Sequence, residues 1–464
     1  MFLRLAGPRR LAGIAIIVLL TWVTVLWISL PFDSSVLSWI RLMTAKAFGI
    51  IRSPNDDERL LLEQPGRFPF TDDEVAYIVK TGYGTQERVP ALLEASWRTR
   101  ARPEYEEDNI LLVGDFTAEF EFQGKTVVIH DMVAAAMEHE AVVKTTVKNT
   151  ERSYKYGNMT LAIKDGKKKE AEEYSKAVGW ELDALKFIPS LELAWKTMPG
   201  KKWYIMQDDD TFIIRPSLYR FLEHLDPSNQ LLYLGNAIGD YTARFAHGGS
   251  SFILSQAAMR RLFENPDVVS QAYVASLDET WGDKLIATTL IKVGVYISER
   301  YGHFFNGERP LITKASADRF CSPLVSFHGL AQPAQMKEVG KTFAGLDTPV
   351  FWKDLWEIYG QPSLDVLDKN PIRQGQDHVG RQDDPSMISR AESVDKCLAD
   401  CESRGKECLA WTWDKQTKLC ILSPWVVVGE HPKDRYSGLN VGEFTPRCPA
   451  LFLALAAQAA LVKP

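Results

Sequence analysis

The stretch WYIMQDDDTF, which occupies Trp203–Phe212, decides the fold class and the chemistry that this sequence can support. Its first half is apolar and predicts a buried strand, and three carboxylates follow at the carboxyl end of that strand. Three adjacent acids repel one another, so a cation is the simplest way to stabilise them together. Because side chains alternate along an extended segment, Asp208 and Asp210 are expected to point the same way.

The carboxylate oxygens of this triplet suit Mg²⁺ or Mn²⁺ as ligands. Such an ion is a Lewis acid that can neutralise a diphosphate leaving group. A solvated acidic turn or a helix N-cap is the alternative interpretation, because Asp favours both. The choice between a metal site and an acidic turn therefore depends on the segments around the triplet.

The segments around the triplet alternate between strand-like and helical patterns. Strands are expected at Val75–Lys80, Ile110–Val113 and Val127–His130, with helices at Val89–Trp97 and at Glu170–Lys196, the second broken near Pro189. This alternation predicts an α/β fold on a mixed, mostly parallel sheet. Such sheets bind ligands beyond the carboxyl ends of their strands, where the triplet lies.

Three polar segments further along the chain add candidate site residues. Gly248–Gly249 precede an apolar strand, and paired glycines permit a ligand to approach the backbone closely. Asp278, Glu279 and Asp283 form a second acidic cluster before a helix, and His328 follows a short apolar strand. Taken singly, each of these segments is also compatible with a purely structural role.

The composition excludes several classes of protein. Of 464 residues, 45% are hydrophobic and 25% are charged, which is typical of globular chains and excludes disorder throughout, collagen-like sequence and coiled coils. A net charge of −6 argues against nonspecific binding to nucleic acid, which needs a basic surface.

The N-terminal part predicts a membrane anchor. Leu11–Leu30 carries no charge over a length that can span a bilayer as a helix, and it exceeds the apolar core of about 7–15 residues of a cleaved signal peptide. Arg4, Arg9 and Arg10 precede it and Asp33 follows, so residues 1–10 are expected in the cytoplasm. We therefore predict a single-pass type II protein with a stem at 31–73, everything after the anchor being lumenal.

The C-terminal part is expected to hold a small cysteine-rich module. A polar linker is predicted at 359–392, the module at 393–446, and an apolar tail of unknown role at 447–464. Cys397, Cys401, Cys408 and Cys420 lie close together, and an oxidising lumen favours their pairing, whereas the C-x₂-C spacing of zinc modules is missing. Asn158 begins a glycosylation sequon.

Together the motifs resemble the family 31 glycosyltransferases, which include the Fringe-type and core-1 β-1,3-galactosyltransferases, and in particular the fungal branch with a C-terminal PAN/Apple-like module. The resemblance covers about residues 74–356 and 393–440. The segments that carry it are Trp203–Phe212, Ala246–Ser255, Gly179–Phe187 and Phe304–Glu308. It implies a single catalytic domain of the GT-A fold at 74–358.

The resemblance implies a role for each candidate residue. Asp210 is expected to ligate the metal directly, Asp208 to reach the metal or the ribose of the nucleotide, and His328 to complete the metal shell. The residues expected to contact the nucleotide-sugar are Thr81, Arg88, Asp115, Lys186, Asp208 and Asp209.

The same resemblance places Asp283 as the catalytic base, with Asp278 and Glu279 as backups. His247 and Gly248–Gly249 are expected to line the donor and acceptor pocket. In PAN/Apple-like modules a helix is tied to the sheet by two disulfides, which implies Cys397–Cys420 and Cys401–Cys408. Cys321 and Cys448 are left either to pair with each other or to stay free.

The function implied is that of an inverting, Mn²⁺-dependent glycosyltransferase of the Golgi membrane. It would move a sugar, galactose or N-acetylglucosamine or another hexose, from a UDP-sugar to a glycan or glycoprotein acceptor, forming a β-1,3 linkage. The alternative is an inactive, lectin-like scaffold that binds glycan or protein through the PAN/Apple-like module. The donor sugar, the acceptor and the oligomeric state are left open by the sequence.

Overall fold

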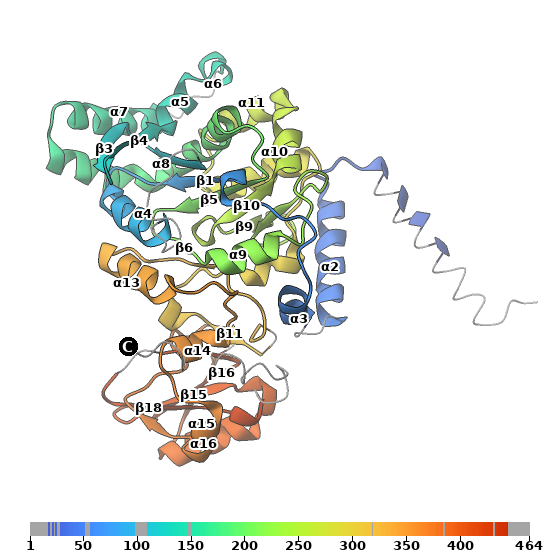
Figure 1. The fold of residues 1–464 in the computed structure, drawn as a ribbon, viewed down its shortest axis with the longest axis vertical. Helices are drawn as coiled ribbons and strands as arrows, with labels where there is room; N and C mark the ends of the chain where they lie inside the picture. The colour runs from blue at the N-terminus through green and yellow to red at the C-terminus, as the bar shows by residue number, and fades with distance from the viewer. Residues whose placement is uncertain are drawn as a thin grey trace, which may run out of the picture.

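The computed structural model describes residues 17–18, 21–22, 24–25, 28–51, 56–97, 109–145, 150–317, 319–383, 386–429 and 432–443. They form a larger α/β part and a smaller part with its own sheet, drawn in orange and red at the C-terminal end of the colour scale (Figure 1).

The larger part is built on a seven-stranded mixed sheet of strand order β3-β4-β2-β1-β5-β10-β7. The four central strands, β4 (Lys125–Asp131), β2 (Ile110–Gly114), β1 (Val75–Lys80) and β5 (Trp203–Asp208), run parallel. The outer strands β3 (Ala118–Phe122), β10 (Phe252–Ser255) and β7 (Tyr233–Gly235) pair antiparallel with their neighbours. The predicted mixed sheet is therefore confirmed, but it is not mostly parallel: three of its pairings are parallel and three are antiparallel.

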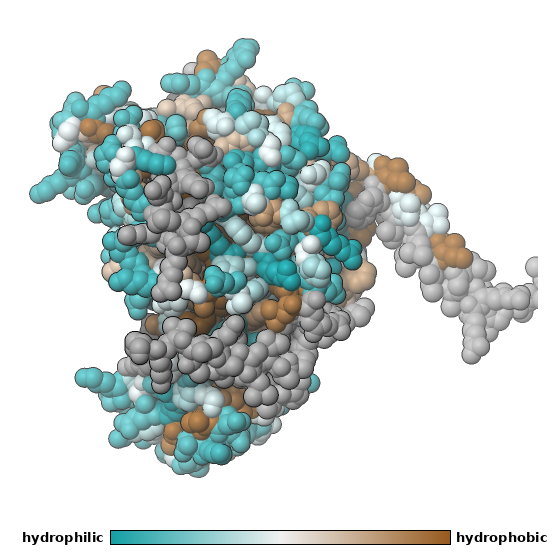
Figure 2. Space-filling model, viewed as in Figure 1, coloured by the Kyte–Doolittle hydropathy of each residue, from teal (hydrophilic) through white to brown (hydrophobic). Residues whose placement is uncertain are grey.

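Two apolar cores cover the two faces of this sheet, because side chains alternate along each strand. In β1, Val75, Tyr77 and Val79 belong to one core, whereas Ala76 and Ile78 belong to the other. Figure 2 shows mainly hydrophilic side chains on the face of the larger part that it presents, in agreement with the apolar ones lying inside.

The helix α8 (Lys168–Thr197) covers the core that contains Ala76 and Ile78. Pro189 lies inside this helix, so the break predicted near Pro189 is wrong. A proline in a helix interior costs about 3 kcal/mol. Its neighbours Ile188 and Leu191 are fully buried, and their burial offsets that cost.

The other helices of the larger part complete its layers. They are α4 (Val89–Trp97), α5 (Met132–Glu138), α6 (Glu140–Lys144), α7 (Thr150–Lys164), α9 (Arg215–Leu222), α10 (Gln256–Phe263), α11 (Pro266–Ala275), α12 (Gly282–Lys292), α13 (Pro333–Phe343) and α14 (Asp354–Ile358). The sequon residue Asn158 falls inside α7 and not in a loop.

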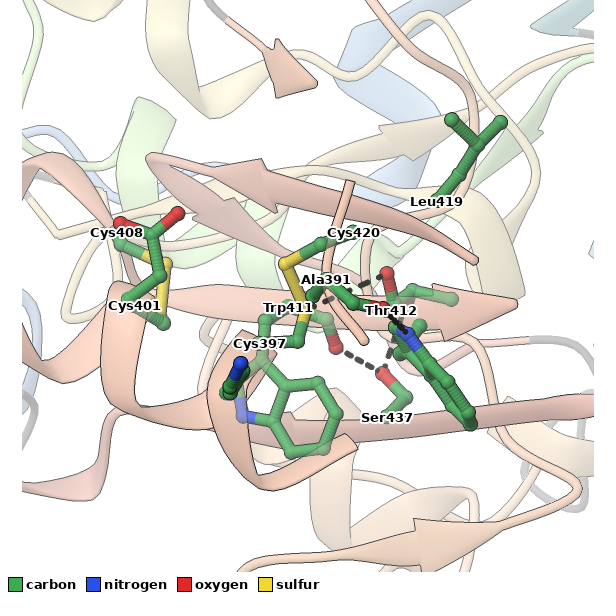
Figure 3. The surroundings of a disulfide bond; sticks show 12 residues. Ala391, Cys397, Cys401, Cys408, Trp411, Thr412, Leu419, Cys420 and Ser437 are labelled. Atoms are coloured by element: carbon green, nitrogen blue, oxygen red, sulfur yellow. Dashed lines mark hydrogen bonds between the residues drawn. A yellow bond between two sulfur atoms is a disulfide. The ribbon is translucent and has the colours of Figure 1, made fainter. Parts of the chain in front are cut away.

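The smaller part is a five-stranded antiparallel sheet packed against the helix α16 (Val394–Ser403). Its strands are β13 (Arg373–Gln374), β18 (Arg435–Leu439), β15 (Ala410–Asp414), β16 (Leu419–Ser423) and β14 (Met387–Arg390). The disulfides Cys397–Cys420 and Cys401–Cys408 tie α16 to this sheet, as predicted (Figure 3). Cys321 is also disulfide-bonded, and Cys448 lies outside the described residues.

The segment predicted as a linker, 359–392, is instead folded in its described part. It contributes α15 (Leu364–Lys369), β13 and β14, and the last two are strands of the smaller sheet. Its polar composition suggested a linker because its buried polar groups, Asp377 and His378, are not recognisable as core residues from sequence. Thr412 of β15 donates a hydrogen bond to Asp377 at 2.8 Å, and His378 Nδ1 lies 3.1 Å from the Val428 carbonyl oxygen.

The N-terminal segment after residue 30 packs against the larger part. α2 (Ser35–Ile51) buries Leu37 and Leu42, and the guanidinium of Arg41 lies 3.2 Å from the centre of the Tyr296 ring. α3 (Asp56–Glu63) buries Leu61. The region predicted as a stem is thus docked where the structure describes it.

Among the described residues, none of the helices has the length and apolar character needed to cross a membrane. The predicted anchor Leu11–Leu30 falls largely outside these residues, and so does the predicted tail 447–464.

Candidate functional site

A pocket of about 320 Å³ opens at the carboxyl ends of β1 and β5. Its walls come from the turn after β1, the acidic triplet at the end of β5, one side of α8, and His328. The lining residues are Lys80, Thr81, Gly82, Gly84, Thr85, Arg88, Asp115, Ser175, Lys176, Gly179, Trp180, Asp183, Lys186, Asp208, Asp209, Asp210 and His328. Every residue predicted to bind metal or nucleotide lies in this set.

Asp208, Asp210 and His328 converge at one end of the pocket. One ligand atom from each lies within 4.8 Å of the others, so the three could hold a metal ion together. Asp208 ends β5, and His328 directly follows β12 (Ser326–Phe327), which pairs with β6 (Phe212–Ile213) just beyond the triplet. The pairing of these two short strands is what brings the histidine to the acids.

The ring of His328 is oriented as a metal ligand requires. Its Nδ1 lies 3.3 Å from the carbonyl oxygen of Gly307, which can only accept a hydrogen bond, so Nδ1 carries a proton. The other ring nitrogen, Nε2, faces Asp210 Oδ1 at 3.3 Å. Burial opposes the charged imidazolium, yet the bond to Asp210 outweighs it, so the pKa of His328 lies above its ordinary value.

Asp209 points away from the end of the pocket where Asp208, Asp210 and His328 meet, which we call the metal end. Its carboxylate accepts hydrogen bonds from the turn after β1. The hydroxyls of Thr81 and Thr85 each donate to Asp209 Oδ2 at 2.6 Å, and Arg88 Nη1 donates to Oδ1 at 3.2 Å. Burial raises the pKa of Asp209 to about 6, although these donors favour the ionised form. The structure therefore gives Asp209 and Thr81 a supporting position under the loop that carries Arg88.

Asp115 and Lys186 are also placed at the pocket, deep in its floor. Lys186 Nζ donates to the Thr81 carbonyl at 3.1 Å and to Asp115 Oδ2 at 3.3 Å. Asp115 is fully buried and accepts a second hydrogen bond from the backbone N–H of Tyr83 at 2.8 Å. Both groups thus fix the shape of the turn Thr81–Gly84.

Lys80 and Asp183 belong to the site although the sequence argument gave neither of them a role. Lys80 Nζ lies 2.6 Å from Asp183 Oδ1 and 3.0 Å from Asp208 Oδ1. Burial opposes the charge, but these two carboxylates outweigh it and raise the pKa of Lys80. Lys80 ends β1, directly opposite Asp208 in register, and that pairing is the signal by which it could have been found.

Asp283 occupies the first turn of α12, beside the glycine pair. Its Oδ2 accepts from the backbone N–H of Gly248 at 2.9 Å, and its Oδ1 accepts from that of Lys284 at 2.8 Å. Burial raises the pKa of Asp283, although these N–H groups favour the carboxylate. A β-carbon on Gly282 would lie 2.2 Å from the Phe187 ring, so α12 reaches this depth only with glycine there.

The other two candidate bases are placed differently. Asp278 is exposed, and Glu279 is engaged by Lys284 Nζ at 3.2 Å. Of the three, only Asp283 bonds to the glycine pair.

The glycine pair lies between Asp283 and the metal end. Gly248 contacts Asp283, while a β-carbon on Gly249 would lie 2.4 Å from His328 Nε2. His247 joins the same cluster: its Nδ1 lies 2.8 Å from Ser250 Oγ, and its ring centre lies 5.4 Å from that of His328. The backbone turn therefore connects the proposed base to the proposed ligand.

We expect Gly249→Ala to weaken binding of divalent metal by about 10- to 100-fold, the range found when the surroundings of a ligating histidine are disturbed. The added methyl group would displace the His328 ring. Mn²⁺ titration of the full chain measures this, with Gly157→Ala as control because a β-carbon there meets nothing within 4 Å. Equal Mn²⁺ affinity in Gly249→Ala and wild type would contradict the placement of His328.

Two family models match the chain. A Fringe-like model matches residues 137–292, and a PAN domain model matches residues 372–436. The Fringe-like match contains the acidic triplet, the glycine pair and Asp283, whereas Lys80, Thr81, Asp115 and His328 are joined to it by the geometry alone.

A curated relative is the human chondroitin sulfate glucuronyltransferase, 25% identical over 165 residues. The alignment covers 34% of this chain and 21% of that protein, so the chain spans about a fifth of its relative's length. The resemblance expected from the motifs is confirmed by these matches: residues 137–292 are similar to the Fringe-like family, and residues 372–436 are similar to PAN domains.

Proposed function

We propose that this protein is a metal-dependent glycosyltransferase that moves a sugar from a UDP-sugar to a glycan or glycoprotein acceptor with inversion at the anomeric carbon. The observation that carries the proposal is the convergence of Asp208, Asp210 and His328 in a pocket lined with cationic side chains, the two aspartates lying within the Fringe-like match. The donor set of two carboxylates and one imidazole fits Mn²⁺ or Mg²⁺. When bound, the ion would act as a Lewis acid on the diphosphate leaving group.

Two cationic side chains, Arg88 and Lys80, are positioned to stabilise the leaving diphosphate. Arg88, whose Nη1 lies 3.2 Å from Asp209 and 3.5 Å from Asp210, is held where a diphosphate would lie beside the metal ligands. Lys80 is fixed next to Asp208 and adds positive charge at the same end. These cations supply electrostatic stabilisation of the charge that develops on the departing diphosphate.

The base in this scheme is Asp283. Inverting transfer needs a carboxylate that takes the proton from the acceptor hydroxyl as the new bond forms. Burial raises the pKa of Asp283 towards the range in which a carboxylate is a better base. The two backbone N–H groups fix its orientation beside the donor pocket.

We also propose that Leu11–Leu30 anchors the chain in the Golgi membrane with residues 31–464 in the lumen. The uncharged N-terminal run and the basic residues before it support the orientation. The two disulfides of the smaller part support an oxidising compartment.

Thermal unfolding of the detergent-solubilised full chain tests the binding half of the proposal. We expect UDP to raise the unfolding temperature only when Mn²⁺ or Mg²⁺ is present, because the diphosphate needs the ion as a counter-charge. A ligand at 100 times its dissociation constant adds about 2.7 kcal/mol of stability, which corresponds to a shift of several degrees. An equal shift by UDP with and without metal, or no shift at all, would contradict metal-dependent donor binding.

A panel of UDP-sugars then identifies the donor. UDP-glucuronate belongs beside UDP-galactose and UDP-N-acetylglucosamine in this panel, because the curated relative is a glucuronyltransferase. Metal-dependent UDP release with one donor would support a transferase. UDP binding without release from any donor would favour the inactive, lectin-like alternative.

A further inference from the structure

The PAN domain is not a separate appendage, since it shares a core with the Fringe-like part. One continuous apolar cluster contains Val325 and Phe327, which lie three residues and one residue before His328, together with Val426 and Val428 of the smaller part. Figure 1 shows β11 (Ala315–Ser316) at the junction of the two parts. There β11 pairs antiparallel with β17 (Trp425–Val426).

One loop of the larger part makes the contacts with the smaller part that are described next. We name residues 306–316 the bridging loop. The backbone N–H of Gly429 donates to the Leu311 carbonyl of this loop at 2.8 Å. Lys314 forms an ion pair with Asp383 and lies 4.4 Å from the centre of the Trp425 ring. The PAN side therefore holds the loop by strand pairing, a backbone hydrogen bond and a charged anchor.

The other end of the bridging loop holds the metal ligand. The Gly307 carbonyl lies 3.3 Å from His328 Nδ1, and the Glu308 carbonyl accepts the backbone N–H of His328 at 3.2 Å. Gly307 is also confined, because a β-carbon there would lie 3.1 Å from Ser250 Oγ. The backbone and the ring of His328 are thus both oriented by this loop.

The loop is braced internally between these two ends. The side-chain amide of Asn306 donates to the Glu308 carbonyl and to Thr313 Oγ1, both at 2.7 Å, and Thr313 Oγ1 donates to the Arg309 carbonyl at 2.9 Å. Asn306 is nearly fully buried. A buried, mutually bonded network of this kind moves as a unit, so a shift at Lys314 is transmitted to Gly307.

We propose that the PAN domain is a positioning element of the metal site: its contacts with the bridging loop hold the Gly307 carbonyl where it orients His328. Lys314, Asp383 and Trp425 are positioning residues in this arrangement, and the inference rests on the proposed metal-dependent function. A partner that orients a ligating histidine typically contributes 10- to 100-fold to metal affinity. The anchor at Lys314 acts one step further away, so its loss is expected to cost less than that.

The test is Mn²⁺ binding by the full chain, measured from the electron paramagnetic resonance signal of free Mn²⁺ during titration. We expect Lys314→Met to weaken Mn²⁺ binding by about 3- to 10-fold, at or below the low end of that range. UDP affinity at saturating Mn²⁺ should stay unchanged, because the nucleotide loop is held elsewhere by Asp209. Lys314→Arg, which keeps the charge, should restore wild-type affinity.

Lys418→Met is the matched control, since Lys418 lies over Trp413 at 4.8 Å on the PAN sheet and outside the junction. We expect this variant to bind Mn²⁺ as wild type does. Equal weakening by Lys418→Met would show a merely structural role and overturn the inference.

A second variant keeps the test decisive if the ion pair alone is too weak. Trp425→Ala removes a side chain that is 6% exposed and over whose ring Lys314 Nζ lies at 4.4 Å. Wild-type Mn²⁺ affinity in both Lys314→Met and folded Trp425→Ala would overturn the inference while leaving the proposed function intact. A wild-type chain that binds no Mn²⁺ would overturn both.

Discussion

Replacing Asp283 by Asn is expected to lower kcat for sugar transfer by about 10²- to 10⁴-fold, the usual contribution of a positioned general base. Asn keeps the size of the side chain but cannot accept a proton from the acceptor hydroxyl. Mn²⁺ and UDP affinities should stay at wild-type values, because Asp283 lies on the far side of Gly248–Gly249 from the metal end. Single-turnover transfer and UDP titration measure the two quantities separately.

Asp267→Asn is the matched control for this prediction. Asp267 is exposed and lies in the first turn of α11, as Asp283 lies in the first turn of α12, so both variants lose the same favourable interaction with a helix dipole. If Asp283 served only as a helix-terminal carboxylate, the two variants would behave alike. Full turnover of Asp283→Asn would remove it from the mechanism and return attention to Asp278 and Glu279.

The pH profile gives an independent check on the same residue. Burial raises the pKa of Asp283, so the carboxylate takes up its proton at a higher pH than an exposed aspartate does. The base is active only when ionised, and kcat/KM is therefore expected to fall as pH decreases through this raised pKa. A profile whose acid limb lies at the ordinary pKa of aspartate would contradict the assignment.

The short-range features of the site could be predicted from sequence. The buried strand Trp203–Asp208 follows from its apolar run, and alternation places Asp208 and Asp210 on one side and Asp209 on the other. The hydrogen-bond partners of Asp209 could not be predicted, because Thr81 and Thr85 come from a turn more than a hundred residues earlier. That contact depends on β1 lying next to β5 in register.

The residues that sequence reasoning missed are those with long-range partners. Lys80 and Asp183 meet across 103 residues, and although Asp183 lies in the segment Gly179–Phe187, nothing local shows that it faces Lys80. The predicted start of the PAN/Apple-like module at residue 393 is wrong for a related reason. Asp377 and His378 look like linker residues, yet both are buried, Asp377 accepting from Thr412 and His378 bonding through its backbone N–H to Ser437. Composition cannot separate a solvated polar segment from one whose polar groups are satisfied inside a fold.

Replacing Asp210 by Asn is expected to abolish Mn²⁺ binding in the usable range and to lower UDP-sugar turnover by at least about 100-fold. An amide is a weaker ligand than a carboxylate, and the ion's Lewis-acid contribution is worth several kcal/mol, where each 1.4 kcal/mol is about tenfold in rate. The change also leaves Arg88 and His328 with one carboxylate fewer. The surplus positive charge then opposes the entry of a cation.

Asp209→Asn is the control for Asp210→Asn, because it makes the same chemical change one residue away. Asp209 faces Thr81 and Thr85, so its replacement should leave Mn²⁺ affinity near the wild-type value and raise the KM for the UDP-sugar by loosening the turn that carries Arg88. Mn²⁺ titration and donor KM, measured on both variants, separate the two carboxylates. Wild-type Mn²⁺ dependence in Asp210→Asn would show that the metal, if one acts, is held elsewhere. Loss of Mn²⁺ binding in both variants would show that the integrity of the turn, and not the ligand itself, controls the site.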